Sequence, residues 1–336
     1  MITSSDCEGA GEVFTVSTAS EDDSSESFFR SPKYLTVSNQ LHLEALAQSV
    51  GNVWTLAPTF RAEKSDTSRH LSEFYMLEAE MSFVDDLGVV MDLAEAMLRS
   101  LSTNLYETNV AQEILSRSGQ VGSDLEPADR VRQRWEGLMQ TAWPRLTYTE
   151  AIKILASKSE LFTHKPTWGG GLQAEHERYI AEHVGGGKPV FVTNYPRDIK
   201  AFYMLPSVTN TDPGRHTRSD TEGVPGPTVE CFDLLVPDLC EIAGGSMREH
   251  RLEQLLDAMR LHGLSTTQSS GDFNNAEHMA DSGTGNLDWY VDLRRWGCPP
   301  HGGFGLGFDR LLSYLSGVQT VRDVVAFPRW FGRCDC

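Results

Sequence analysis

Two runs of aromatic and aliphatic residues, 53–63 and 73–84, lie on either side of the polar stretch EKSDTSRH. Such runs around a polar connection predict two antiparallel strands joined by a long loop. Further β-rich runs follow at 189–195, 228–236 and 241–247, and the glycine-rich run GGFGLGF leads into a helix. Because these strands cluster without a regular alternation of strand and helix, the pattern indicates an α+β domain, an antiparallel sheet flanked by helices.

Apolar spacing predicts several helices. The segment 39–50 is expected to bury one face, and the segment 85–118 is expected to bury residues spaced by four. The residues expected on these faces are Leu43, Leu46, Ala47 and Val50 in the first segment and Leu93, Met97, Leu101 and Leu105 in the second. Thr147 and Glu150 have the pattern of a capping box that opens a further helix. Another amphipathic helix is expected to end at Gly263.

The charge balance is acidic, with 29 Lys and Arg against 47 Asp and Glu, a formal net charge of −18. This balance disfavours a protein that holds nucleic acid by bulk charge, although it leaves room for a local basic site. No apolar run approaches the roughly 20 residues of a membrane helix, so no membrane partner is expected. None of the six cysteines forms a CxxC pair, which disfavours a zinc knuckle and fits a reducing compartment.

The segment FRAEKSDTSRHLSEF, residues 60–74, carries the first candidate site residues. Strand alternation places Arg61 and Glu63 on the same face. An arginine fork suits a phosphate or a carboxylate, and the Glu63 carboxylate can accept a hydrogen bond from an adenine amino group. The Phe74 ring can stack on a base. Taken alone, the segment fits a solvated charged hairpin equally well.

Two later segments add further candidates. Asp233 and Glu241 can face each other from neighbouring strands and bind Mg²⁺ between phosphates, although two acids separated by a turn are also common. In HGGFGLGFDRLL, residues 301–312, the spacing G-x-G-x-G differs from the G-x-G-x-x-G of dinucleotide sites. Its glycines let a nucleotide lie against the backbone, and Arg310 near a helix start can meet a terminal phosphate.

The order and wording of these segments resemble the class II aminoacyl-tRNA synthetases of the aspartyl, asparaginyl and lysyl subgroup. FRAE…RHLSEF is similar to motif 2 of that family, and GFGLGFDR is similar to its motif 3. The resemblance covers essentially the whole chain and is strongest to the asparaginyl members, in segments such as LTVSNQLHLEA, WGGGLQAEHERYI and DLLVPDLCEIAGGSMREHR. It implies the class II catalytic fold and ATP and Mg²⁺ as cofactors.

The resemblance also implies a role for each matching residue. Arg61 would hold the α-phosphate and the substrate carboxylate, and Arg310 would hold the γ-phosphate, which makes these two the catalytic residues. The implied ATP site consists of Arg61, Glu63, Arg69, His70, Phe74, Glu241, Gly303, Gly305, Gly307 and Arg310. The implied asparagine site consists of Glu8, Ser38, Gln40, Arg61 and Arg248, and the implied Mg²⁺ ligands are Asp233 and Glu241.

Position 43 bears on the choice of amino acid. In aspartyl enzymes of the family, a lysine at the end of the matching run contacts the substrate carboxylate. Here the run is SNQLHL, residues 38–43, and ends in Leu43. Leu43 supplies no cation, and a buried carboxylate without a partner would be costly. The residue therefore favours asparagine over aspartate, although Leu43 can also simply be a core residue of its helix.

The expected function is that of an asparagine–tRNA ligase in protein synthesis. Such an enzyme uses ATP to convert asparagine into asparaginyl-adenylate and transfers the asparaginyl group to the 3′ end of tRNA(Asn). The reaction needs no protein nucleophile, because the substrate carboxylate attacks the α-phosphorus directly. Two alternatives stay open: an asparagine-synthetase-like paralogue that adenylates aspartate, and a non-catalytic remnant of a synthetase.

Residues 1–336 are expected to form the catalytic domain, with loop insertions at 206–227 and 265–286. The anticodon-binding OB-fold and motif 1 of the family would precede Met1, so both are expected to be missing from this chain. Motif 1 builds the homodimer interface of the family, which leaves dimerisation of this chain open. Segments such as DLRRWG and VRDVVAFPR are similar to those of bacterial and organellar members, which favours the mitochondrial matrix over the cytoplasm. The first 30 residues carry no targeting pattern.

Overall fold

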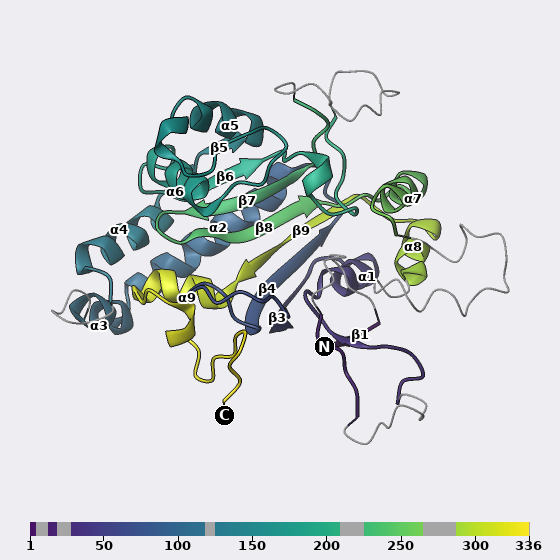
Figure 1. The fold of residues 1–336 in the computed structure, drawn as a ribbon, viewed down its shortest axis with the longest axis horizontal. Helices are drawn as coiled ribbons and strands as arrows, with labels where there is room; N and C mark the ends of the chain where they lie inside the picture. Colours follow the sequence, from purple (N-terminus) through teal and green to yellow (C-terminus); the bar gives the residue numbers. More distant parts are fainter. Residues whose placement is uncertain (5–12, 19–27, 118–124, 209–224, 265–286, 336) are drawn as a thin grey trace.

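The computed structural model describes residues 1–4, 13–18, 28–117, 125–208, 225–264 and 287–335. At its centre lies a seven-stranded sheet with the strand order β3-β4-β9-β8-β7-β6-β5 (Figure 1). Its strands are β3 Val53–Phe60, β4 Glu73–Ser82, β5 Arg145–Thr147, β6 Val190–Thr193, β7 Cys231–Val236, β8 Cys240–Met247 and β9 His301–Gly307. All neighbours pair antiparallel except β5 and β6, which are parallel. The predicted α+β fold with an antiparallel sheet is confirmed, apart from this parallel edge strand.

Helices surround the sheet, as Figure 1 shows. They are α1 Gln40–Val50, α2 Leu87–Tyr106, α3 Asn109–Arg117, α4 Ala128–Met139, α5 Tyr148–Ala156, α6 Ala174–His183, α7 Leu252–Leu261, α8 Asp288–Arg295 and α9 Phe308–Ser316. Helix α2 runs behind the sheet and packs on β8 and β9. A small separate sheet pairs β1 (Ile2–Thr3) with β2 (Tyr34–Leu35).

Local sequence rules account for several element ends. Thr147 and Glu150 form the predicted capping box at the start of α5: the Glu150 N–H donates to Thr147 Oγ1 at 3.2 Å, and Glu150 Oε2 accepts from the Thr147 N–H at 2.8 Å. Helix α7 ends at Leu261, and Gly263 beyond it has φ +72°, which a residue with a side chain rarely adopts. The β3–β4 hairpin pairs Phe60 with Glu73, which leaves residues 61–72 as its connection.

The glycine-rich sequence of β9 has a packing reason. A Cβ atom at Gly303 would lie 2.1 Å from Glu80 Oε2 and 2.2 Å from the Ala79 carbonyl oxygen of β4. A Cβ atom at Gly245 of β8 would lie 2.6 Å from the Phe232 ring. Glycine therefore lets β9 approach β4 closely and β8 approach β7 closely.

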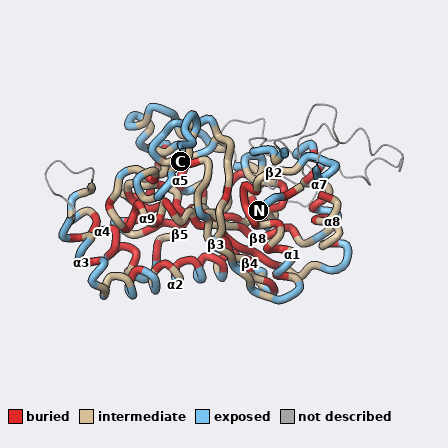
Figure 2. Tube along the Cα trace, turned by 90° about the horizontal axis from the view of Figure 1, so that it is seen from below, coloured by how far each residue is buried: buried red, intermediate tan, exposed pale blue. Residues whose placement is uncertain are grey.

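Three groups of buried side chains form the core. The first joins the central strands to α2, α4 and α9, the second lies between β5–β7 and the α5–α6 pair, and the third joins α1, α7 and α8. In Figure 2 the buried parts of the chain run through the sheet, and exposed parts cover the outer helices. Because α2 packs on one face of the central strands, the side chains between them are held in fixed positions.

Two predicted apolar faces are partly wrong. In α1, Leu43 and Ala47 are buried, but Leu46 is 53% exposed and Val50 is 71% exposed. The buried face of α1 instead includes Glu44, which lies in a charged network described below. In α2 the deeply buried residues are Val90, Met91, Ala94 and Leu98, whereas the predicted residues Leu93 and Leu101 are exposed. A spacing of four drifts around a helix that repeats every 3.6 residues, so it does not stay on one face.

The two predicted loop insertions fall mostly outside the described residues, namely 209–224 and 265–286. Of the first, residues 206–208 and 225–227 are described. Within the described ranges, no helix combines the length and the apolar character that crossing a membrane requires.

Candidate active site

Two adjoining hollows open on the sheet between β3–β4, β8 and β9. The first has a volume of about 200 Å³ and the second of about 240 Å³. Arg61, Met76, Glu241 and Gly305 line both, so the hollows meet at these residues. One binding region with two compartments can therefore hold two reacting groups next to each other.

The first hollow collects nearly all of the predicted ATP-site residues. It is lined by Arg61, Glu63, Arg69, His70, Phe74, Glu241, Gly305, Gly307 and Arg310. Gly303 lines neither hollow, because it packs against Glu80. Strand β3 ends at Phe60, so Arg61 and Glu63 lie in the connection rather than on the strand, yet both face this hollow. The chain thus brings together residues about 240 positions apart.

Three guanidinium groups, those of Arg61, Arg69 and Arg310, line the first hollow together with the carboxylates of Glu63, Glu241 and Asp309. Arg61 Nη1 lies 3.8 Å from Glu63 Oε1, and the Arg61 guanidinium carbon lies 5.5 Å from the Phe74 ring centroid. Arg310 Nη1 donates to the Glu241 carbonyl oxygen at 2.9 Å, which orients this side chain from α9 across to β8. Burial lowers the pKa of His70, and the charges of nearby arginines lower it further against the opposing charge of Glu63. A neutral imidazole beside three guanidinium groups suits a polyphosphate.

The second hollow holds the described residues of the predicted asparagine site. Ser38, Gln40, Arg61 and Arg248 all line it, and Glu8 lies outside the described residues. Leu43 lines it as well and is only 5% exposed. Leu43 is therefore both a residue of the binding hollow and a core residue of its helix, the two roles considered for it from the sequence.

A carboxylate of β4 fixes the loop before α1 at the rim of the second hollow. Glu78 accepts hydrogen bonds from the Ser38 hydroxyl, from the Asn39 N–H at 2.9 and 3.0 Å, and from Asn39 Nδ2 at 2.9 Å. The Gln40 side chain donates to Glu44 at 3.0 Å. These bonds hold Ser38 and Gln40 in defined positions before a substrate arrives.

Arg248 follows β8 and lines the second hollow, and the side chains of Glu80 and Ser246 hold its guanidinium group. Its Nε and Nη2 donate to the two carboxylate oxygens of Glu80 at 3.1 and 3.0 Å, and its Nη1 donates to Ser246 Oγ at 2.6 Å. A bidentate pair of this kind fixes the plane of the guanidinium. Arg248 therefore presents a rigid donor to whatever side chain enters the hollow.

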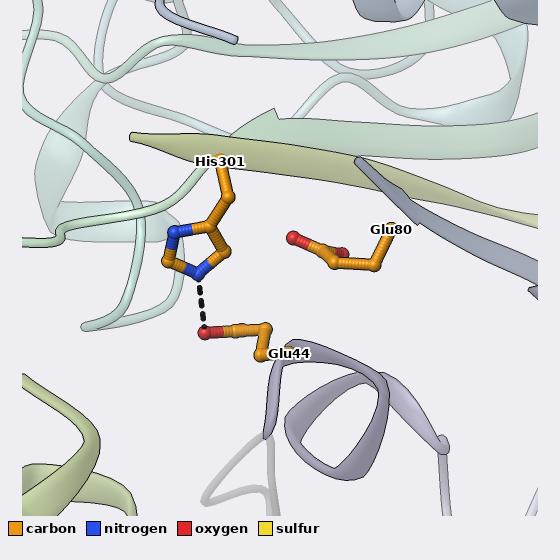
Figure 3. Close-up of side chains that lie close together, drawn as sticks. All are labelled: Glu44, Glu80 and His301. Carbon is orange, nitrogen blue, oxygen red and sulfur yellow. Dashed lines mark hydrogen bonds and ion pairs between the residues drawn. The ribbon is translucent and has the colours of Figure 1, made fainter. Parts of the chain in front are cut away.

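Beneath the second hollow, Glu44, Glu80 and His301 converge from α1, β4 and β9, as Figure 3 shows. Among the described residues, this is the one group of at least three possible ligand atoms with metal-like spacing. Glu44 accepts from His301 Nε2 at 3.0 Å, from Arg294 Nη2 at 2.7 Å and from the Tyr290 hydroxyl at 2.7 Å. Because Arg294 and Arg248 already supply the positive charge, the group is a buried ion network rather than a metal site.

The network shifts the pKa of its members in different directions. Burial disfavours the charged Glu44, but Arg294, His301 and Arg248 outweigh it and hold the pKa of Glu44 well below its usual range. Burial also disfavours a charged His301, but hydrogen bonds with Cys298 and Glu44 and the charges of Glu44 and Glu80 raise the pKa of His301 to about 10. His301 is therefore a buried imidazolium at neutral pH.

The free energy of unfolding is expected to decrease as the pH rises from about 7 to 10. The folded pKa of His301 exceeds its usual value of 6.5, so the stabilisation is complete below pH 6.5 and is lost as the pH approaches 10. A rise of this size corresponds to at most about 5 kcal/mol. Urea unfolding at pH 7, 8.5 and 10 measures it, with His301→Gln as the variant in which the dependence should flatten. A stability that stays constant or rises over this range would contradict the prediction.

The two predicted Mg²⁺ ligands lie near each other on β7 and β8. A Cβ atom at Gly244 would lie 3.3 Å from Glu241 Oε1 and 3.5 Å from Asp233 Oδ1, so the two carboxylates flank this glycine. Burial and the charge of Asp233 raise the pKa of Glu241, which means that this carboxylate lacks sufficient counter-charge. Oxygen ligands of this kind suit Mg²⁺. Glu241 fits the ion directly, whereas Asp233 is already paired.

Lys200 is the partner of Asp233 and was not among the predicted site residues. Its Nζ donates to both Asp233 oxygens at 2.9 Å and lies 4.1 Å from the Tyr195 ring centroid. Lys200 also lines the second hollow. An ion reaching both Asp233 and Glu241 would have to share Asp233 with this ammonium group.

Sequence reasoning also missed Glu44, Glu78, Glu80, Glu177 and Arg294. Burial and the charges of Glu241 and Asp233 raise the pKa of Glu177 to about 7, which places this carboxylate beside the predicted Mg²⁺ ligands. Single acids on helices and strands carry no local signal of burial. An alternating pattern gives one clue, because Glu78 and Glu80 lie on the same face of β4 as the apolar residues Phe74 and Met76.

Two features define the fold of the class II tRNA synthetases. One is an antiparallel sheet whose hairpin connection carries an arginine, and the other is a glycine-rich strand that leads into a helix with a second arginine. The sequence matches the family model described as tRNA synthetases class II (D, K and N) over residues 1–331, and the chain belongs to this family.

Similar proteins place the chain within the asparaginyl branch of this family. It is 42% identical to the mitochondrial asparagine–tRNA ligase of Saccharomyces cerevisiae over 98% of this chain and 62% of that protein. It is 41% identical to the asparagine–tRNA ligase of Clostridium tetani over 100% of this chain and 65% of that protein. The chain thus spans less than two thirds of the length of these relatives.

A solved structure agrees with the sequence comparisons. The asparaginyl-tRNA synthetase of Pyrococcus horikoshii complexed with asparaginyl-adenylate superimposes with a TM-score of 0.74 at 31% identity, covering 99% of this chain and 62% of that one. The similarity therefore extends from the sequence motifs to the whole arrangement of helices and strands.

Proposed function

We propose that the chain is the adenylating part of an asparagine–tRNA ligase. It would activate asparagine with ATP and transfer the asparaginyl group to the 3′ end of tRNA(Asn). The observation that carries this proposal is the junction of the two hollows at Arg61 and Glu241. A compartment lined by three arginines, which suit a polyphosphate, adjoins a compartment with a fixed arginine. Transfer of the adenylyl group of ATP to an amino-acid carboxylate requires two binding sites next to each other in this way.

In the proposed reaction, ATP occupies the first hollow. Phe74 would stack on adenine, Glu63 would accept from its amino group, and His70 would face the pyrophosphate side. Arg310 would hold the γ-phosphate near the Gly305–Gly307 floor. When Mg²⁺ is bound, at Glu241 and shared with Lys200 at Asp233, it neutralises phosphate charge. The residues otherwise contribute position and positive charge, which are the main needs of phosphoryl and acyl activation.

Asparagine would occupy the second hollow. Arg61 would orient its carboxylate for attack on the α-phosphorus, and pyrophosphate would leave toward Arg310. Arg248 would donate to the side-chain carbonyl oxygen, since Glu80 holds its guanidinium in place. Leu43 offers no charge to a second carboxylate, so aspartate would lose solvation without gaining a partner.

Pyrophosphate exchange tests this proposal. Labelled pyrophosphate is expected to enter ATP when asparagine is present, and aspartate is expected to support less than about one tenth of that rate. Charging of a tRNA(Asn) transcript then tests the transfer step. Exchange with aspartate alone would favour the asparagine-synthetase-like alternative. Absence of both exchange and calorimetric ATP binding would favour a non-catalytic remnant.

We also propose that this catalytic unit forms a homodimer. Exposed apolar side chains of α1 and β3 support the proposal: Val50 is 71% exposed, Trp54 is 70% exposed and Leu56 is 41% exposed. Strand β3 is the edge of the sheet, where unpaired backbone groups favour association. Light scattering of the purified chain measures its oligomeric state.

The proposed location is the mitochondrial matrix rather than the cytoplasm. The similarity to the mitochondrial ligase of yeast supports this, although similar bacterial ligases are also found. Imaging of the gene product fused to a fluorescent protein at its C-terminus tests the location.

A further inference from the structure

The C-terminal segment Thr320–Arg333, called the strap below, lies along the β3–β4 connection, residues 61–72, called the nucleotide loop. The Val321 N–H and the Thr320 hydroxyl both donate to the Ser68 carbonyl oxygen, at 3.0 and 3.1 Å. At the other end of the loop, the Ser72 N–H donates to the Arg329 carbonyl oxygen at 2.7 Å. The strap therefore contacts the nucleotide loop at two separate points.

Arg322 makes the central contact of the strap. Its Nη2 donates to Asp66 Oδ1 at 2.8 Å and to the Thr67 carbonyl oxygen at 3.0 Å. Its guanidinium carbon lies 4.2 Å from the Trp330 ring centroid, so the ring holds the side chain from the strap side. Asp66 is 73% exposed and Arg322 only 19%, which makes the arginine the anchored partner.

The loop that Arg322 holds carries the phosphate-side residues of the first hollow. Arg69 and His70 line that hollow, and His70 is bonded to the Thr67 and Ser65 hydroxyls. A link therefore runs from Arg322 through Thr67 to His70. Val321 of the strap lines the same hollow. The strap thus fixes both the loop and part of the hollow.

We propose that the strap positions the nucleotide loop for ATP, with Arg322 as its main positioning residue. The proposal rests on the proposed function, since it assigns ATP to the first hollow. Ordering a loop at the moment of binding weakens the binding, because the lost conformational freedom has to be compensated. A loop already held by Arg322 avoids this loss, and its arginines face the phosphates before ATP enters.

Arg322→Met in the full chain tests the proposal. The Michaelis constant for ATP in pyrophosphate exchange is expected to rise about ten- to hundredfold, the effect of losing a charged hydrogen bond. The Michaelis constant for asparagine should change much less than that for ATP. No strap residue lines the second hollow, and the loop residue that does, Arg61, directly follows β3, several positions from the Arg322 contacts at Asp66 and Thr67. Arg322→Lys should recover part of the loss, since one donor can still reach Asp66.

Arg333→Met is the matched control. The Arg333 guanidinium carbon also lies near the Trp330 ring, at 4.9 Å, but its ion pair is with Asp335 and not with the loop. This variant should leave both Michaelis constants unchanged. If Arg322→Met does not fold, Asp66→Asn removes the same ion pair from the exposed side and should also raise the constant for ATP.

Hydrogen exchange gives a readout that does not need activity. Amides of residues 61–72 should exchange about tenfold faster or more in Arg322→Met than in Arg333→Met. Faster exchange in a protein that lacks ATP turnover would support the strap and contradict the proposed function. Unchanged exchange and an unchanged constant for ATP would overturn the strap. An equal rise of both Michaelis constants would also overturn it, as it would indicate a general structural role.

Discussion

Arg61→Gln is expected to slow adenylate formation by about 10³-fold or more. Arg61 lines both hollows, so the proposed reaction places it between the α-phosphate and the attacking carboxylate. Glutamine can donate a hydrogen bond, but it has no positive charge to stabilise the negative charge that develops on the oxygens of the α-phosphorus. Removing one such preorganised donor costs about 10²- to 10³-fold, and the loss of a full charge adds to this. Pyrophosphate exchange at saturating ATP and asparagine measures the effect.

Arg117→Gln is the control for this prediction. Arg117 lies on α3, is 67% exposed and pairs with Glu113 one helical turn away. Its replacement should leave the exchange rate unchanged. A decrease of less than about tenfold in Arg61→Gln would contradict a role for Arg61 at the reacting phosphate.

Glu44→Gln is expected to lower the free energy of unfolding by about 3–5 kcal/mol, the usual cost of breaking a buried ion pair from one side. Glutamine has nearly the same volume, so the change removes charge without opening a cavity. Arg294 and His301 would then lose their described carboxylate partner, and Arg248 would keep its pair with Glu80. Urea unfolding at pH 7 measures the loss.

Glu44→Gln is also expected to change the pH dependence of the free energy of unfolding. Without the Glu44 charge the pKa of His301 should fall, and His301 should be neutral at pH 7 more often. The decrease of stability between pH 7 and 10 should therefore be smaller than in the unchanged protein. Glu113→Gln, at an exposed position of α3, should change neither quantity. Full stability of Glu44→Gln at pH 7 would show that the network does not depend on this carboxylate.

Much of the fold follows from local sequence. The capping box of Thr147 and Glu150 and the end of α7 before Gly263 are each set by residues within a few positions of one another. The β3–β4 hairpin joins two strands that follow each other in the sequence. These features can be predicted because they depend on turn chemistry, capping and short-range periodicity. The motifs in segments 60–74 and 301–312 also predict that both segments contribute to one site. Residues of both segments line the first hollow.

The burial of individual residues could not be predicted in the same way. Leu46 and Val50 were expected in the core because they are apolar, yet Glu44 occupies the buried face of α1. Glu44 is stabilised by His301 and Arg294, which are 257 and 250 positions away in the sequence. A charged residue that looks solvent-exposed in its own segment becomes a core residue once distant cations reach it.

The sequence by itself determined the α+β class, the family, and the segments that supply Arg61, Phe74, Asp233 and Arg310. The tertiary structure decided how those side chains are held. It pairs Lys200 with Asp233, Arg248 with Glu80 and Arg322 with the nucleotide loop. Local rules act between neighbours in the chain, whereas a buried charge is stable only beside an opposite charge, and its position depends on how the whole sheet brings distant segments together.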